Sequence, residues 1–165
     1  MQATSVTPEA NDRFSVGPCL DHQAVLGTGG KMLLWGTRVM ISAAENNRCY
    51  RAEVEQVFFK AGIPEILVSW QDALATVALG ASRQVMVGEV EQGSLTQDEQ
   101  RLLWPIARLQ QHPNQCACSP IREICHGAAV QSIMCRLNRI SALLSTKELY
   151  VANFQQPHSV SLAIH

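Results

Sequence analysis

The sequence predicts an all-α fold, an irregular bundle of about five helices, and three observations support it. Apolar residues recur at helical spacing in four separate stretches. Residues suited to helix caps stand at the ends of these stretches. A lone short β-like segment would have no partner strand. With 165 residues, 47% of them hydrophobic and 16% charged, the chain has a globular composition and enough length to bury a core.

The first helix is expected from about residue 31 to residue 44. Its apolar face carries Met32, Trp35, Val39 and Ala43. The turn Gly27–Gly30 is expected to precede this helix. The segment Glu45–Arg48 should end it, because Asn favours caps and turns over helix interiors.

A second and a third helix are predicted over residues 51–61 and 65–82. Gly62 stands where a C-terminal cap belongs, and Pro64 prevents continuation, so these helices should form a close hairpin. Phe58 and Phe59 are adjacent and point about 100° apart on a helix. Either both are core residues, or one is exposed and marks a contact surface.

Residues 83–92 are expected to form an extended loop or a continued helix end. The next segment, Thr96–Glu99, fits a capping box, in which the Thr96 side chain and the Glu99 side chain each bond the other's backbone. Apolar residues follow it at helical spacing and predict a fourth helix. Pro105 lies inside that helix and predicts a kink or a restart there.

The last long helix is expected from about residue 120 to residue 145, after a loop over residues 112–119. Ser119 would cap it, with Pro120 at a favoured first position. The predicted organisation is a disordered or loop leader over residues 1–20, a single helical domain over residues 21–153 and a frayed tail over residues 154–165.

Charge and hydropathy point away from nucleic acid and from membranes. The net charge is −1, whereas nucleic-acid binding needs a concentrated positive field. Residues 1–99 carry a net charge of −5 and residues 100–165 one of +4. We expect complementary packing of the two halves; the alternative is an acidic partner docking near Arg136, Arg139 and Lys147. No apolar run approaches the ~20 residues of a membrane span.

The beginning of the chain lacks the pattern of a secretory signal peptide, so a cytoplasmic protein is expected. The six cysteines would be reduced in that compartment and cannot be assumed to form disulfides.

A cluster of cysteines and histidine is the candidate site for chemistry. Thiolates and imidazoles are zinc ligands, and the candidate metal-binding residues are Cys116, Cys118, Cys125 and His126. A set drawn from Cys19, His22, Cys116 and Cys118 is also chemically possible. The spacing is unlike that of structural zinc sites, and a free cysteine often packs as a small hydrophobe.

A second interpretation of the cluster is a thiol redox sensor. Cys118 directly precedes the last predicted helix, whose dipole would lower the pKa of that thiol. A sensor of this kind needs Cys116 or Cys118 exposed, with a second thiol in reach.

Catalytic patterns are weak. The segment Gly27–Lys31 suggests phosphate binding at a helix N-terminus, but its spacing departs from a P-loop and a flexible turn is the preferred interpretation. The histidines form no acid–base set and no nucleophile elbow is present. The acidic residues are expected mostly on polar helix faces. The sequence therefore favours a non-enzymatic protein.

The order of three motifs resembles an uncharacterised bacterial family of small helical proteins, a domain of unknown function. The matching segments are Leu34–Arg38, Phe58–Phe59 and Leu95–Leu103, and the likeness covers about residues 30–110. Members of that family carry cysteines just before the last motif, where this chain has Gly88–Gly93. The resemblance implies an all-helical fold and no activity.

These observations lead to two functional hypotheses. The first is a non-enzymatic interaction or regulatory protein with a protein partner or self-association. The second is a cysteine-based site, either zinc or a thiol redox sensor.

Overall fold

The computed structural model describes residues 26–152 and confirms an all-α fold. This part of the chain has six helices and, apart from two isolated backbone bridges, no β-structure. The helices are α1 (Thr28–Glu45), α2 (Arg51–Lys60), α3 (Pro64–Gly80), α4 (Gln97–Gln111), α5 (Ser119–Arg122) and α6 (Gly127–Thr146). The expected leader and tail lie outside the described residues.

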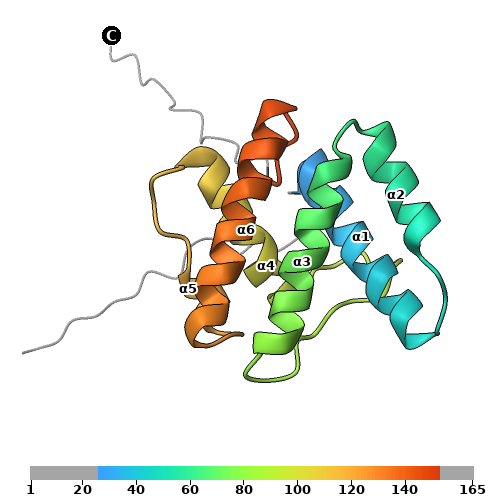
Figure 1. Cartoon of the computed structure of the whole chain (residues 1–165), viewed down its shortest axis with the longest axis horizontal. Coiled ribbons are helices and arrows are strands. Elements are labelled where there is room, and N and C mark those ends of the chain that lie inside the picture. Colours follow the sequence, from blue (N-terminus) through green and yellow to red (C-terminus); the bar gives the residue numbers. More distant parts are fainter. Residues whose placement is uncertain (1–25, 153–165) are drawn as a thin grey trace, which may run out of the picture.

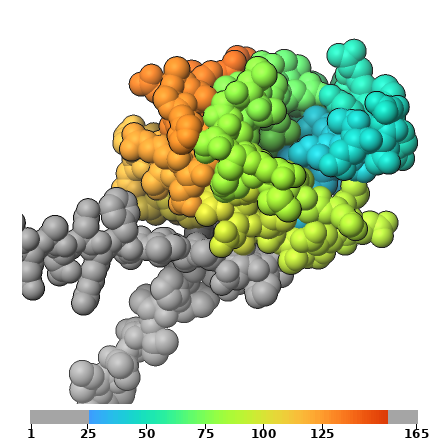
Figure 2. Space-filling view, turned by 90° about the horizontal axis from the view of Figure 1, so that it is seen from below, coloured from blue at the N-terminus to red at the C-terminus, as the bar shows by residue number. Residues whose placement is uncertain are grey.

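Helices α3 and α6 run side by side through the middle of the molecule and make its largest helix contact (Figure 1). Helix α4 packs on α6, and α1 contacts both α2 and α4. Figure 2 shows α3 and the segment after it lying between the orange α6 and the blue and cyan pair α1 and α2. No described helix is long and apolar enough to cross a membrane.

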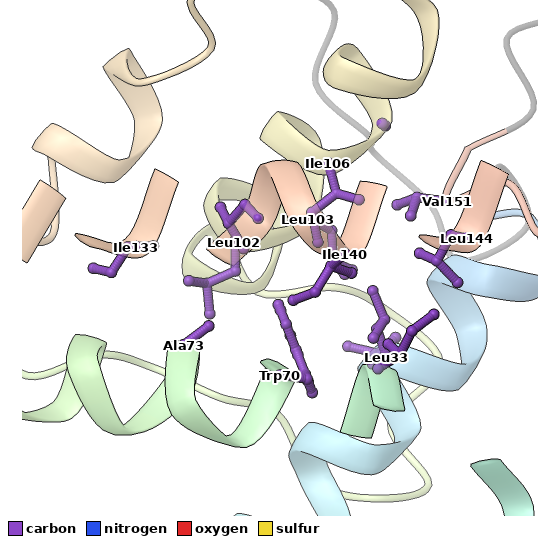
Figure 3. Packing of buried hydrophobic residues seen from close by; sticks show 14 of the residues in the cluster. Leu33, Trp70, Ala73, Leu102, Leu103, Ile106, Ile133, Ile140, Leu144 and Val151 are labelled. Atoms are coloured by element: carbon purple, nitrogen blue, oxygen red, sulfur yellow. The ribbon is translucent and has the colours of Figure 1, made fainter. Parts of the chain in front are cut away.

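The core is aliphatic and is centred on one large aromatic side chain. Trp70 of α3 is fully buried and points toward the layer formed by α4 and α6 (Figure 3). It is surrounded by buried residues from four helices, among them Leu33, Ala73, Leu103, Ile106 and Ile140. Its indole N–H donates to Thr37 Oγ1 at 2.9 Å, and that hydroxyl donates to the Leu33 carbonyl at 2.8 Å. The polar tip of Trp70 is therefore satisfied inside the core.

Three helices end in the same way. Each is followed by a residue in the left-handed backbone conformation, and the N–H groups of that residue and of the next one donate back to carbonyls of the helix. The left-handed residues are Asn47 after α1, Gly62 after α2 and Glu148 after α6, with φ of 49°, 71° and 55°. After α2, the Gly62 N–H donates to Phe59 O at 2.9 Å and the Ile63 N–H to Phe58 O at 3.0 Å, which is a Schellman motif. The predicted ends at Glu45–Arg48 and at Gly62 are confirmed.

The prediction of one last helix over residues 120–145 is wrong. The chain breaks after α5, and Cys125 and His126 are extended before α6 begins. Cys125 pairs with Ala81 in a backbone bridge, and the Ser82 N–H donates to Ile124 O at 2.9 Å. Gly127 has φ of 53°, which a side-chain-bearing residue rarely adopts, so this glycine permits the turn.

The turn expected at Gly27–Gly30 instead forms the first turn of α1. The free N–H groups of that turn are capped by a distant segment, the C-terminal strap, which we define as residues 149–152. The Gly29 N–H donates to Tyr150 O and the Gly27 N–H to Val151 O, each at 3.0 Å. An ideal Cβ on Gly29 or Gly30 would clash with strap carbonyls, so both glycines permit this close approach.

Helix α4 holds the strap from the other side. The Gln110 side-chain amide donates to Leu149 O at 2.9 Å and accepts from the Val151 N–H at 2.8 Å. These two hydrogen bonds pair a carbonyl and an N–H of the strap backbone, as a neighbouring β-strand would do. Helix α4 itself runs through Pro105 without a restart.

The contact between α1 and the strap predicts that replacing Gly30 by alanine destabilises the protein. Alanine normally stabilises a helix relative to glycine by up to about 1 kcal/mol. Gly30→Ala should instead lower the free energy of unfolding by about 1–3 kcal/mol, because the new Cβ meets the Val151 carbonyl. Urea denaturation followed by circular dichroism measures this. Gly93→Ala is the control, since nothing lies within 4 Å of its Cβ position; equal effects of the two substitutions would contradict the strap contact.

Candidate functional site

A buried ion pair joins the first helix to the start of the fourth. Arg38 of α1 and Glu99 of α4 are each 1% exposed. The Arg38 guanidinium donates from Nε to Glu99 Oε1 at 2.7 Å and from Nη2 to Glu99 Oε2 at 2.8 Å. This bidentate geometry is the strongest form of an Arg–carboxylate pair.

The same two side chains fix the loop between α3 and α4. Arg38 also donates to the carbonyls of Gln92 and Ser94, the latter at 2.7 Å. Glu99 accepts from the Gly88 N–H at 3.0 Å and from the Thr96 N–H at 2.7 Å. Residues 83–92 consequently form a loop held by side chains, extended up to a turn at Glu89–Gln92; a loop is one of the two forms expected for them from sequence.

The predicted capping box is confirmed, and its acidic residues are buried. Thr96 Oγ1 accepts from the Glu99 N–H at 3.1 Å. Beside it, Asp98 is 2% exposed and binds Arg83 through both carboxylate oxygens, at 2.6 and 2.8 Å. Asp98 also accepts from the Met86 N–H and from Arg101. The expectation that acidic residues lie mostly on polar faces is wrong for these two.

The pKa values of both carboxyl groups are lowered by these partners. The hydrogen bond from Arg83 lowers the pKa of Asp98 to about 2, assisted by Met86 and Arg101 and opposed by burial. For Glu99, burial is the largest influence and raises the pKa. The hydrogen bonds from Arg38, Thr96 and Gly88 together outweigh it, so that the net shift is downward. Both groups are therefore ionised at neutral pH.

The hydrogen bonds of Arg38, Glu99, Arg83 and Asp98 form a structural network. Across residues 26–152, every buried side-chain nitrogen and oxygen has a hydrogen-bond partner. A void of about 10 Å³ beside Thr37, Trp70 and Glu99 has room for about one water molecule. The ion pair thus has no unpaired hydrogen-bonding group to offer a ligand, and the void beside it holds no more than about one water molecule.

The exposed chemistry lies on the loop between α4 and α5. The sulfur atoms of Cys116 and Cys118 are 2.8 Å apart and share a hydrogen bond. Cys116 is exposed and Cys118 is half-buried, while Ala117 between them is only 1% exposed. Burial of Ala117 anchors the loop and turns both flanking side chains to the same side. The two residues form what we call the dithiol.

The two thiols of the dithiol differ in acidity. The hydrogen bond from the Cys118 thiol lowers the pKa of Cys116, with help from the Cys118 backbone N–H and the charge of Arg122. The same shared hydrogen bond, and then burial, raise the pKa of Cys118. A helix dipole was expected to acidify Cys118, but α5 has only four residues and Cys116 is the more acidic thiol.

The remaining metal candidates lie apart from the dithiol. Cys125 is 1% exposed and its thiol faces the Val77 carbonyl at 4.0 Å, where burial raises its pKa. His126 is exposed and forms the N-cap of α6. Within residues 26–152, no three Cys, His, Asp or Glu side chains are placed to hold a metal ion together. Cys19 and His22 fall outside the described residues.

The phosphate interpretation of Gly27–Lys31 is wrong. Of the N–H groups at the start of α1 that would bind an anion, those of Gly27, Gly29 and Gly30 already donate to carbonyls of the C-terminal strap. Of the two adjacent phenylalanines, Phe58 is fully buried and Phe59 is 73% exposed. Only Phe58 is therefore a core residue; that Phe59 marks a contact surface stays a prediction.

Comparisons with protein-family models, with curated proteins and with solved structures give no match to this chain. The resemblance to a bacterial domain family stays a prediction. Two of its motif segments, Leu34–Arg38 and Leu95–Leu103, contribute the partners of the buried ion pair. These segments consequently have a structural explanation that is independent of any family.

The ion pair predicts a large loss of stability when one partner is neutralised. Glu99→Gln should lower the free energy of unfolding by about 3–5 kcal/mol, because it leaves the buried Arg38 charge uncompensated. Guanidinium denaturation of the purified variant measures the loss. Glu55→Gln is the matched control, since its pair with Arg51 is exposed and worth under about 1 kcal/mol. A loss at Glu99 no larger than at Glu55 would refute this role.

Proposed function

We propose that the protein is a regulatory protein whose chemical switch is the Cys116–Cys118 dithiol. The observation that carries this proposal is the 2.8 Å separation of the two sulfur atoms on an exposed loop. A disulfide has an S–S distance of about 2.05 Å, so closing the bond needs a displacement of less than about 1 Å.

The switch would operate by thiol–disulfide exchange with an external disulfide. The Cys116 thiolate attacks one sulfur of the external disulfide and forms a mixed disulfide, releasing one thiolate. The Cys118 thiol then loses its proton, attacks the Cys116 sulfur and expels the second thiolate. The protein loses two electrons and two protons overall, and the external disulfide becomes two thiols. The reduced form returns by the reverse exchange.

The exposure of the two thiols supports these roles. Cys116 is exposed and Cys118 is half-buried, so Cys116 is the sulfur that an external disulfide can reach, and the direction of its pKa shift, downward, is that of an attacking thiolate. Cys118 has a raised pKa and lies within reach of the mixed disulfide, as a resolving thiol must. Because Cys116 is exposed and Cys118 packs against the core, a disulfide between them would change both the exposed shape of this loop and its contact with the core.

Oxidation experiments test the proposed switch. With glutathione disulfide, wild-type protein should form an intramolecular Cys116–Cys118 disulfide that dithiothreitol reverses. Cys118→Ser should stop at the mixed disulfide on Cys116, and Cys116→Ser should react more slowly at neutral pH. Peptide mass spectrometry and timed alkylation of free thiols measure these products and rates.

Cys135→Ser is the control for these experiments, because Cys135 is exposed on α6 and has no sulfur partner among the described residues. Oxidation that reaches Cys49 and Cys135 but never joins Cys116 to Cys118 would exclude the switch. Elemental analysis of protein purified without chelator addresses the zinc alternative. About one zinc per chain, lost in the Cys116→Ser/Cys118→Ser variant, would favour a metal site over a switch.

A second candidate function is protein contact through α2, in which the protein self-associates. The exposure of Phe59 favours it, since a large aromatic side chain in water contributes strongly once an interface covers it. Val68 and Leu79 of the neighbouring helix α3 are also exposed.

Light scattering over a range of protein concentrations tests this self-association. Wild-type protein should exceed the monomer mass at high concentration, and Phe59→Ser should remain monomeric. Lys60→Ser is the control, because Lys60 is the adjacent exposed residue. A strictly monomeric wild-type protein would rule self-association out.

A further inference from the structure

We infer that the external disulfide that reacts with the dithiol is anionic, and that Arg122 selects it by charge. The inference rests on the proposed switch and concerns the substrate class of that same site. Its basis is the arrangement of charges around Cys116 and Cys118.

Arg122 stands at the fourth residue after Cys118 along the α5 turn. Its backbone N–H donates to Cys118 O at 3.1 Å, which completes that turn. Residues four apart on a helical turn are neighbours on its surface. Arg122 is exposed and stands on the turn that begins at Cys118, so its positive charge lies on the same part of the surface as the dithiol.

Three other arginines after residue 100 have partners of their own. Arg101 pairs with Asp98 and with Glu123, Arg108 lies over the Trp104 ring at 6.0 Å, and Arg136 donates to Ser132. Arg122 is exposed, and no carboxylate among residues 26–152 forms an ion pair with it. It is therefore a cation available to a ligand.

The loop that carries the dithiol contains no acidic residue, and Glu123, the acidic residue that follows it, is paired with Arg101. The segment from residue 111 to residue 122 contains no Asp or Glu, and residues 100–165 carry a net charge of +4. A disulfide bearing carboxylates would be attracted to this surface, and a disulfide bearing ammonium groups would be repelled. Tripeptide disulfides of the glutathione type have the required charge and the required disulfide bond.

The experiment measures the first attack alone, in the Cys118→Ser background. The rate of mixed-disulfide formation on Cys116 is measured with three probes: glutathione disulfide, which is anionic, bis(2-hydroxyethyl) disulfide, which is neutral, and cystamine, which is cationic. The ratio of the anionic rate to the cationic rate is then compared between arginine variants. Because every variant reacts with the same probes, comparing this ratio between variants removes the intrinsic reactivity of each probe.

Arg122→Gln should lower this ratio by about three- to tenfold at low salt, and Arg122→Glu should lower it further. Added salt should shrink the effect, because it screens exposed charges. Arg139→Gln is the matched control: Arg139 is exposed on α6 and has no part in the pKa shift of either thiol.

A ratio that Arg122→Gln leaves unchanged, or lowers no more than Arg139→Gln does, would overturn the role of Arg122. This outcome is distinct from failure of the switch itself. The switch fails if wild-type protein forms no Cys116–Cys118 disulfide, whereas charge selection is measured on the mixed disulfide and needs no second step.

Discussion

The pairing of Arg38 with Glu99 constrains more of this structure than any other contact. It links α1 to α4 across the core, and its remaining hydrogen-bonding groups hold the loop between α3 and α4. Burial of two charges is costly, and only complete hydrogen bonding offsets the cost. The loop backbone supplies those bonds, so the path of residues 88–94, which includes a turn at Glu89–Gln92, is a requirement of the ion pair. Four helices are thereby placed around Trp70 in one arrangement.

Residues close together in the sequence predicted several helix ends correctly, whereas contacts between residues far apart in the sequence could not be predicted. The capping box at Thr96 and the end of α2 at Gly62 involve atoms only a few residues apart, and both are as expected. Burial of Arg38 depends on an acid 61 residues away, and nothing near Arg38 indicates that partner. The break at Cys125 depends on a bridge to Ala81, although Gly127 was a local sign of it.

The cysteines show the same difference between what neighbouring residues predict and what distant contacts decide. Their number and spacing indicated a candidate site but not which of them would meet. Folding separates Cys125, which packs against α3, from Cys116 and Cys118, which share one turn of exposed loop. The deciding residue is Ala117: its burial sets the direction of both neighbours, and burial of a single alanine cannot be deduced from its neighbours in the sequence. The two thiols also differ in exposure, since Cys116 is exposed and Cys118 is half-buried, and this difference follows from the fold.

The C-terminal strap couples the order of synthesis to the order of folding. The first turn of α1 receives its hydrogen-bond acceptors from Tyr150 and Val151, which a ribosome adds about 120 residues later. Until then, the N–H groups of Gly27 and Gly29 have only water as a partner. The start of α1 therefore has to remain open throughout translation of the other five helices. The hydrogen bonds that cap α1 therefore form only after residues 149–152 have been synthesised.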